Sequence, residues 1–434
     1  MNEKGKELYE EVKSKIARLK QEGTLEKQFG DFWKLGCLAK YRSFDLQHLY
    51  EDSAREFINR YKEQLTKMRE FCVENLEELT EKCIKVMERT CHFKVYYAKT
   101  NKEAQKIFMD ELGDNKVIYK SKSNEAKDIG IIDVLKENDI EIKETDLGDV
   151  INQLFKYELP AYSLGPGVHF LEEEVSAKFN EVYGLNLAPN AKAVVNYLRE
   201  TYRKELLNDV KVSLTSANAI SAEDGTIILG ENEGNISLLT RATDKHIVVI
   251  GITKIVPTLM DAVLITKIQE RINYVSMAYI SLISGPSNSS DIQGKKVEGM
   301  YGAKEVVVIF VDDWRIEAAK KDLIYKDFLK CISCKSCNFV CPASRAFGNV
   351  YASKYGLGGC MIIRDYIHQG LEAAVRDGLF LCTGCENCYN WCPVSVNIGE
   401  ILKLIKREAT EKGLAPPPLE NYKEKILKEK NPFK

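Results

Sequence analysis

Histidine, proline and net charge are all scarce in this sequence. Only 5 histidines and 11 prolines occur among 434 residues, and 62 basic residues nearly balance 64 acidic ones, which leaves a formal net charge of −2. No G-x-G-x-x-G segment lies between an expected strand and helix, and no P-loop lysine motif is present. These absences exclude the two nucleotide-binding loops, and the lack of a basic field argues against nucleic acid as a partner.

Long hydrophobic runs are also missing. The most apolar stretch, residues 246–265, is interrupted by Lys254, Pro257 and Asp261, so we expect a buried strand and a helix rather than a membrane span. The first residues, MNEKGKELYEEVKSK, contain no apolar signal-peptide core, so we expect a cytoplasmic protein, peripheral to a membrane only through partners. In a reducing cytosol, clustered cysteines usually bind metal rather than form disulfides.

The residue pattern divides the chain into four parts. Residues 1–91 are expected to be helical, because apolar residues recur at three- and four-residue steps and proline is absent before Pro160. Residues 92–320 alternate expected strands and helices, residues 321–415 hold most of the cysteines, and residues 416–434 are predicted to form a polar tail along a surface or partner.

The second part has the pattern of an α/β domain. Strands are expected at 92–100, 115–123, 140–148, 224–232, 245–252 and 304–313. Helices are expected at 101–112, at 124–138, and in a long stretch that ends near Ser281. Alternation of this kind predicts a largely parallel sheet.

Eight of the 13 cysteines form two copies of C-x2-C-x2-C-x3-C-P, beginning at Cys331 and Cys382. Three thiolates at two-residue gaps can bind three corners of a cubane, and in two-cluster ferredoxins the fourth cysteine ligates the other cluster. The spacing therefore predicts two [4Fe–4S] clusters with crossed ligation. The expected ligands are Cys331, Cys334, Cys337 and Cys392 for the first cluster, and Cys382, Cys385, Cys388 and Cys341 for the second.

Zinc is the alternative occupant, because paired C-x2-C is also a zinc-ribbon spacing. A zinc ribbon needs only four ligands, however, and has no use for a third cysteine plus C-P in both halves. We therefore favour iron–sulfur clusters. The other cysteines lack motif spacing and are interpreted as small buried residues: Cys37, Cys72, Cys83, Cys91 and Cys360.

The segments around the second motif are compatible with helices, at residues 358–381 and 397–410. The arrangement resembles the α-helical ferredoxin module of succinate dehydrogenase and heterodisulfide reductase subunits more than the compact β-containing ferredoxin. The resemblance implies a C-terminal α-helical ferredoxin-type domain.

Polar turns in the α/β part carry a second resemblance. The segments are ETDLGD from Glu144, GPGVHF from Gly165, NEGN from Asn232, KIVPTL from Lys254, and SGPSNSSDIQG from Ser284. In this order they resemble the LUD domain. Followed by two ferredoxin motifs, they resemble the lactate utilisation protein B family over roughly residues 41–407, although the family's PAIH segment reads PGVH at 166–169.

This resemblance implies a fold of the NagB/RpiA/CoA-transferase type and a role as the electron-transfer subunit of a multi-subunit system that oxidises a 2-hydroxy acid, L-lactate to pyruvate. Implied partners are a cysteine-rich-domain protein, a second LUD protein or a flavin dehydrogenase. Two alternatives stay open. The α/β domain could act as a CoA-transferase-like enzyme on a carboxylate or acyl ester, or the chain could be a scaffold with structural clusters.

The residues yield no catalytic assignment, but they do suggest a ligand pocket. Ligands commonly bind at strand ends of open α/β sheets, and polar side chains gather in the turns there. His169 follows Gly-Pro-Gly, and Glu233 follows an expected strand. We predict a polar cleft for a small carboxylate or a partner's peptide, formed by His169, Asn218, Glu233, Asn235, Ser284 and Ser287.

Overall fold

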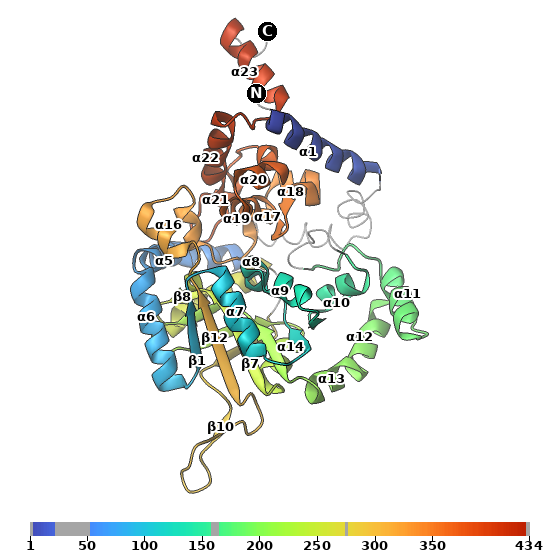
Figure 1. Ribbon diagram of the computed structural model, residues 1–434, viewed down its shortest axis with the longest axis vertical. Helices are drawn as coiled ribbons and strands as arrows, with labels where there is room; N and C mark the ends of the chain where they lie inside the picture. Colours follow the sequence, from blue (N-terminus) through green and yellow to red (C-terminus); the bar gives the residue numbers. More distant parts are fainter. Residues whose placement is uncertain (1–2, 22–52, 158–164, 274–276, 431–434) are drawn as a thin grey trace.

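The computed structural model describes residues 3–21, 53–157, 165–273 and 277–430. Within them an α/β domain, running from β1 to β12, lies below a mostly helical module that holds both cysteine motifs (Figure 1). We call the latter the cysteine module. Helix α23 (Pro417–Glu429) projects at one end of the molecule, and the short hairpin of β10 (Asn288–Ser289) and β11 (Val297–Glu298) projects at the other.

The main sheet has six strands. All of its neighbouring strands pair in parallel. In spatial order they are β1 (Lys94–Ala98), β12 (Glu305–Val311), β7 (Lys245–Gly251), β4 (Val212–Thr215), β2 (Val117–Lys120) and β3 (Glu141–Glu144). The two central strands read EVVVIFV and KHIVVIG, the continuous apolar runs expected of strands that are buried on both faces.

Successive residues of these central strands supply two different cores. Ile247, Val249, Val307 and Ile309 face α7 (Asn101–Leu112), α8 (Asn124–Ile129) and α9 (Ile131–Glu137). The residues between them, such as Val248 and Val308, pack into the larger core that extends into the cysteine module. Because successive side chains of a strand point to opposite faces of the sheet, the same strands contribute to both cores.

A second sheet of four strands lies in the larger core. Its order is β8 (Ile255–Val256), β5 (Ala219–Ser221), β6 (Ile227–Glu231) and β9 (Tyr279–Ile283). Strand β5 pairs in parallel with β8, whereas β6 runs antiparallel to both β5 and β9. Helix α15 (Leu259–Asn273) packs on this sheet.

Helices on one side of the α/β domain form a separate small core around Phe179. They are α10 (Leu147–Leu154), α11 (Glu172–Tyr183), α12 (Ala191–Glu200) and α13 (Tyr202–Asn208). Helix α14 (Asn235–Arg241) lies between β6 and β7 in the chain.

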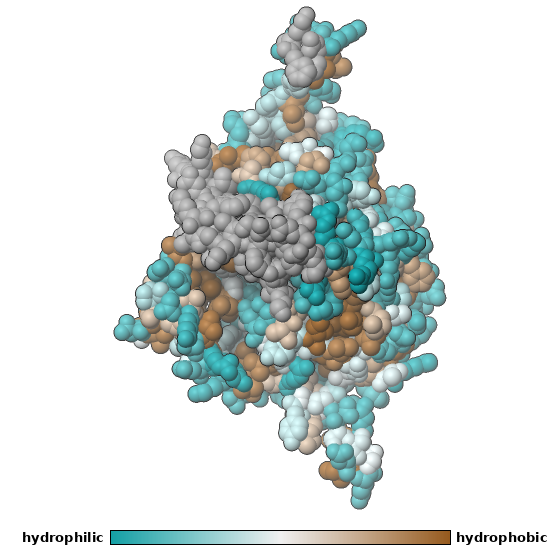
Figure 2. All heavy atoms as spheres, turned by 180° about the vertical axis from the view of Figure 1, so that it is seen from behind, coloured by the Kyte–Doolittle hydropathy of each residue, from teal (hydrophilic) through white to brown (hydrophobic). Residues whose placement is uncertain are grey.

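Seen from behind, the molecule presents a mostly hydrophilic surface with separate hydrophobic patches (Figure 2).

The cysteine module consists of short helices and one small ribbon. Its longer helices are α19 (Gly359–Gln369) and α22 (Ile398–Glu411). The shorter elements are α16 (Arg315–Lys321), η4 (Lys326–Lys330), α17 (Ser336–Phe339), α18 (Pro342–Phe347), η5 (Gly348–Val350), β13 (Ala352–Ser353), β14 (Gly356–Leu357), α20 (Leu371–Arg376), η6 (Leu379–Leu381) and α21 (Asn387–Asn390).

The N-terminal helices join the two parts of the molecule. They are α1 (Glu3–Gln21), α5 (Ser53–Glu74), α6 (Leu76–Val86) and the π-helical turn η2 (Met87–Cys91). Buried Arg69 of α5 donates hydrogen bonds to the carbonyls of Leu329 (2.8 Å) and Lys330 (3.0 Å) in the cysteine module, and to that of Thr253 (2.9 Å) in the α/β domain. The helix therefore fixes how the two parts sit together.

The structure confirms the α/β class, the parallel sheet and the helical regions on either side. Helix α7 has the predicted bounds. The helix predicted to continue to about Ser281 is wrong at its end, because α15 stops at Asn273 and the aromatic and β-branched run Tyr279–Ile283 forms β9 against β6. The segment predicted as a polar tail contains α23. Cys37 lies outside the described residues.

Candidate functional site

The eight motif cysteines surround two adjoining cavities. The first is lined by Cys331, Cys334, Cys337 and Cys392. The second is lined by Cys341, Cys382, Cys385 and Cys388. Each cavity thus contains the first three cysteines of one motif and the last cysteine of the other, and Cys337 and Cys388 contribute to both walls.

The two motifs share one backbone shape. Ser333 and Lys335 in the first motif have φ of 59° and 65°, and their counterparts Gly384 and Glu386 in the second have φ of 67° and 60°. A left-handed residue on each side of the second cysteine curls the chain around a common centre. Repeated strain of this kind at non-glycine residues indicates a functional constraint.

Backbone amides point at several sulfurs. Ser333 N lies 3.4 Å from Cys331 Sγ, Ser344 N 3.4 Å from Cys341 Sγ, and Val396 N 3.2 Å from Cys392 Sγ. Pro342 sits in the first turn of α18, directly after Cys341 as its N-cap. Amide donors of this kind stabilise thiolates, and hydrogen bonds to the sulfurs help to set the potential of an iron–sulfur cluster.

The described cysteines are free thiols, and they would have to lose their protons to bind a metal cluster. None of the 12 described cysteines is in a disulfide. Burial raises the pKa of the Cys388 and Cys392 thiols to about 11, so ligation of a metal cluster there would release protons. Among the described residues, no three His, Cys, Asp or Glu side chains are arranged around a single metal ion.

The two cavities differ in exposure. In the first motif Cys334, Lys335 and Ser336 are buried, whereas residues 383–387 of the second motif are exposed. Cys360, interpreted from the sequence as a buried small residue, is 3% exposed and also lines the first cavity, with its Sγ 3.7 Å from Asn338 Oδ1. The first site is therefore the inner one, and the second faces solvent.

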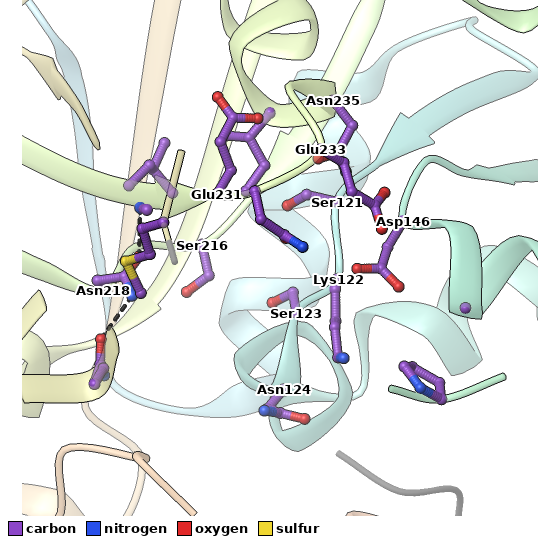
Figure 3. Close-up of a pocket in the computed structure, with 18 of the residues that line it drawn as sticks. Ser121, Lys122, Ser123, Asn124, Asp146, Ser216, Asn218, Glu231, Glu233 and Asn235 are labelled. Carbon is purple, nitrogen blue, oxygen red and sulfur yellow. Dashed lines mark hydrogen bonds between the residues drawn. The ribbon is translucent and has the colours of Figure 1, made fainter. Parts of the chain in front are cut away.

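A larger cavity of about 510 Å³ lies between the α/β domain and the first cysteine motif. We call it the interdomain cavity. Its size is typical of small-molecule sites. Polar residues at the ends of β2, β4 and β6 and in the turn before α10 form part of its wall (Figure 3). Ser333 and Lys335 of the cysteine module complete it.

Two of the predicted pocket residues belong to hydrogen-bond networks in the wall. Asn218 accepts a hydrogen bond from Gly230 N (2.9 Å) and donates one to Gln269 Oε1 (2.6 Å), as Figure 3 shows in part. Gln269 in turn donates to the carbonyl of Ile332 in the first motif (2.6 Å). Asn235 donates to Thr145 Oγ1 at 3.1 Å. Asn218 and Asn235 therefore shape the cavity, and Asn218 also begins a chain of contacts to the first cluster site.

Glu233 stands at the mouth of the interdomain cavity with its carboxylate toward Asp146 (Figure 3). Its Oε2 accepts a hydrogen bond from Leu147 N at 3.1 Å. Desolvation, and then the negative charge of Asp146, raise the pKa of Glu233 to about 7. Because the residue is exposed, water screens this effect. The direction of the shift stands, and Glu233 holds its proton to a higher pH than an ordinary glutamate.

The remaining predicted pocket residues lie elsewhere. Strand β9 runs antiparallel to β6, with Glu231 opposite Tyr279 and Ile227 opposite Ile283. The residues after β9 are therefore at the opposite end of the sheet from Glu233, and Ser284 contacts Thr226 Oγ1 (2.8 Å). Neither Ser284 nor Ser287 lines the interdomain cavity.

His169 is also absent from the cavity wall, although the preceding loop residues, 165–168, contribute to it. Its ring packs on those of Tyr157 and Phe170, with centroids 4.3 and 4.2 Å apart. His246 is buried in β7 and contacts Thr215 Oγ1 at 2.7 Å. Burial lowers its pKa to about 3, so His246 is a buried structural residue of the sheet.

A buried ion network joins the two parts of the molecule behind the interdomain cavity. Asp128 of α8 contacts Arg364, His368 Nε2 (3.0 Å) and Arg315 Nη2 (3.4 Å). Glu125, also on α8, lies 3.6 Å from Arg315 Nη2 and 3.8 Å from Arg364 Nη2. Burial alone would raise the pKa of Asp128, but Arg364 and the hydrogen bond from His368 hold it well below its usual range.

Comparison with known protein families gives one match to the α/β domain and one to the cysteine module. The family model of the LUD domain matches residues 80–311, which is more than half of the chain. The family model of the 4Fe-4S dicluster domain matches residues 327–396. Fold and cysteine sites thus define an α/β domain joined to a 4Fe-4S dicluster domain. The chain belongs to the LUD-domain family. The interpretation of the cysteine motifs is confirmed at this level, whereas the ligand of each cysteine stays a prediction.

Several curated proteins are similar to most of the chain. The "Uncharacterized electron transport protein YkgF" of Escherichia coli is 26% identical, over 82% of this chain and 72% of that protein. "Lactate utilization protein B" of Geobacillus thermodenitrificans is 27% identical, over 80% and 72%. "Lactate utilization protein B" of Shouchella clausii is 27% identical, over 92% and 77%.

A solved structure of a DUF162 family protein from Deinococcus radiodurans aligns with 54% of this chain and 98% of its own, at a TM-score of 0.31 and 14% identity. In the part of the chain that the structure describes, every helix is too short or too polar to cross a membrane.

Proposed function

We propose that this chain is the iron–sulfur electron-transfer subunit of a system that oxidises a 2-hydroxy acid, with L-lactate to pyruvate as the expected reaction. The observation that carries the proposal is the mixed cysteine lining of the two adjoining cavities. Crossed ligation of this kind belongs to two-cluster ferredoxins, in which each [4Fe–4S] cluster takes up and passes on one electron.

The donor set fits two four-iron clusters. Each cavity is lined by the four cysteines expected to ligate one [4Fe–4S] cluster. Cys360 and Cys388 also line the first cavity, and Cys337 also lines the second. We assign Cys331, Cys334, Cys337 and Cys392 to the first cluster and Cys341, Cys382, Cys385 and Cys388 to the second. Because the cavities share wall residues, electrons need to cross only a short distance between the two sites.

The difference in exposure suggests a direction. The first site is buried and adjoins the interdomain cavity through Ser333 and Lys335, which line both. The second site is bordered by the exposed segment 383–387, which includes Cys385. We infer that the inner site communicates with the interdomain cavity and that a redox partner docks at the segment 383–387.

Similar proteins support the lactate assignment by their names, which refer to lactate utilisation and to electron transport. The partners we propose are a cysteine-rich-domain protein and either a second LUD protein or a flavin dehydrogenase. They would supply the step that turns the two-electron oxidation of a hydroxy acid into single-electron transfers, because each cluster carries one electron at a time.

Cofactor content and ligand replacement test the assignment. Protein prepared without oxygen should contain about eight irons and eight sulfides per chain. Cys341→Ser should damage the second cluster and Cys392→Ser the first, as read by electron paramagnetic resonance of the reduced protein. Cys360→Ser is the matched control, since it changes a buried cysteine of the first cavity that has no assigned cluster. Stoichiometric zinc, or loss of each mutant's own-motif cluster, would overturn the proposal.

Turnover assays separate the alternatives. An electron-transfer subunit should reduce its clusters only with a donor partner present. Lactate oxidation by the isolated chain with an artificial acceptor would instead favour an enzyme, and thioester exchange dependent on Glu233 would favour the CoA-transferase-like reading. Clusters that no donor can reduce would favour a scaffold.

A further inference from the structure

The interdomain cavity contains two buried ammonium groups that lack a counter-ion contact. Lys254 and Lys335 are 8% and 6% exposed, and both line the cavity. Within the described residues neither side chain forms a hydrogen bond or an ion pair. Burial lowers the pKa of Lys254, and the nearby Glu125 opposes this shift. A buried cation without a hydrogen-bonding partner is strongly unfavourable, so the cavity is built to receive an anion.

A hydroxyl group lies in the same wall. Ser216 is 9% exposed, and its Oγ is buried without a hydrogen-bond partner within the described residues. It follows β4 and projects toward the cavity in Figure 3. A hydroxyl both donates and accepts hydrogen bonds, so Ser216 suits an oxygen atom that neighbours the anionic group of a ligand.

The acidic residues of the wall limit the charge of this ligand. Glu125 pairs with Arg315 and Arg364 and also attracts Lys254 from beyond ion-pair distance, and Glu231 accepts hydrogen bonds from Ser237 N at 2.9 and 3.0 Å. Asp146 and Glu233 also line the cavity, and Lys122 beside them offsets only part of their charge, so this part of the wall disfavours a dianion. A carboxylate with a single negative charge fits better than a phosphate.

The two lysines also lie beside the first cluster site. Lys335 stands between Cys334 and Cys337 in the chain and lines both the interdomain cavity and the first cysteine cavity. Lys254 lies close enough to Cys331 for a charge on that sulfur to act on its ammonium group. The same positive charges therefore face a ligand on one side and the cysteine ligands on the other.

We propose that the interdomain cavity binds a 2-oxo or 2-hydroxy carboxylate at Lys254, Lys335 and Ser216, and that this binding is linked to the oxidation state of the first cluster. The inference rests on the proposed function. An added electron places negative charge next to the lysines, so the reduced protein binds the anion more weakly. By reciprocity the bound anion lowers the reduction potential of the first cluster.

Binding is measured by calorimetry on the cluster-loaded protein without oxygen, with sodium pyruvate, L-lactate and inorganic phosphate as separate probes. Pyruvate or lactate should bind saturably, and Lys254→Met should weaken binding at least tenfold. Lys304→Met is the control, because Lys304 is a surface residue paired with Asp244 at 3.4 Å outside the cavity. Ser216→Ala, which removes only one hydroxyl, is a second variant and should weaken binding several-fold even if Lys254→Met fails to fold.

The linkage is measured by redox titration of the first cluster, followed by electron paramagnetic resonance, with and without saturating pyruvate. A tenfold weaker affinity of the reduced protein corresponds to a potential lower by about 59 mV for one electron. This shift should disappear in Lys254→Met and persist in Lys304→Met. An unchanged potential at saturating pyruvate would overturn the linkage.

The remaining outcomes separate this inference from the proposed function. Tighter binding of phosphate than of pyruvate would overturn the carboxylate assignment. Clusters that are reduced normally in a protein that binds no carboxylate would overturn the inference alone, and would leave the lysines as counter-charges to the cluster. Clusters that cannot be reduced would overturn both.

Discussion

The ion network around Asp128 offers a quantitative test of how the two parts of the chain are joined. Asp128 lies on α8 of the α/β domain, while its partners Arg364 and His368 lie on α19 of the cysteine module. The side chain of Asp128 is 1% exposed and that of Arg364 is 9% exposed. The perturbation is Asp128→Asn, which keeps the shape of the side chain and removes its charge.

The expected cost is large, because the arginines would keep their charges without their main counter-ion. Breaking a buried ion pair by removing one partner typically costs about 3–5 kcal/mol. Glu125 would still face Arg364 and Arg315, at 3.8 and 3.6 Å, so we expect the lower half of this range, about 3–4 kcal/mol. Natural domains are stable by only about 5–15 kcal/mol, so such a loss is readily measured.

The assay is urea unfolding of the cluster-loaded protein without oxygen, compared for the wild type, Asp128→Asn, Arg364→Met and the double variant. Because the residues are in contact, the double variant should lose less than the sum of the single losses, by about 0.5–3 kcal/mol. Asp244→Asn is the control. Its carboxylate is 51% exposed and pairs with Lys211 and Lys304, and exposed pairs contribute only about 0–1 kcal/mol.

The pH dependence provides an independent check. The folded protein holds the pKa of Asp128 below its ordinary value, so this group stabilises the fold above its unfolded pKa of about 3.9 and loses that effect as the pH falls further. The wild type should therefore lose stability more steeply below pH 4 than Asp128→Asn. Equal acid sensitivity together with additive single losses would refute the reasoning.

Two further predictions concern the walls of the interdomain cavity. Gln269→Leu should leave Asn218 Nδ2 and the Ile332 carbonyl without their partner, at a cost of about 1–3 kcal/mol each, and should change the resonance spectrum of the first cluster but not that of the second. The pKa of Glu233 is raised to about 7 in the folded protein. The free energy of unfolding should therefore fall as the pH rises from about 4.5 to 7, because this carboxyl group loses its proton. Thermal unfolding across this range should show that Glu233→Gln removes the decline while both clusters still form, and an unchanged decline would contradict the assignment.

The cysteine motifs and the central strands could be predicted because local sequence determines them. The two apolar runs are continuous rather than alternating, which is typical of strands in a sheet that is covered on both faces. The spacing of the cysteines follows from the geometry of a cubane. Strand β4 was missed because its residues VSLT are half polar, and their hydroxyls are satisfied only by distant partners such as the Leu239 carbonyl (2.9 Å) and His246.

The pocket was harder to predict, since it depends on contacts between parts far apart in the chain. Ser284 is grouped with Glu233 in the prediction because both lie in polar turns, but the antiparallel pairing of β9 places it at the other end of the sheet. In the sequence, Lys254 stands out only as a break in an apolar run, and nothing singles out Lys335. A lysine in a buried segment is itself a signal, because a charge is rarely buried unless a partner of opposite charge lies near it.

The position of α1 has a consequence for biosynthesis. Lys15 of this first helix donates a hydrogen bond at 3.0 Å to Asp377, which lies 362 positions later in the chain, and Leu8 is buried in the core shared with the cysteine module. A ribosome must therefore complete most of the polypeptide before α1 can form these contacts. Until then the apolar face of the helix stays exposed to solvent. Such long-range closure slows folding and exposes a nascent chain to aggregation, so maturation of the clusters and docking of the N-terminal helix are expected to be completed together.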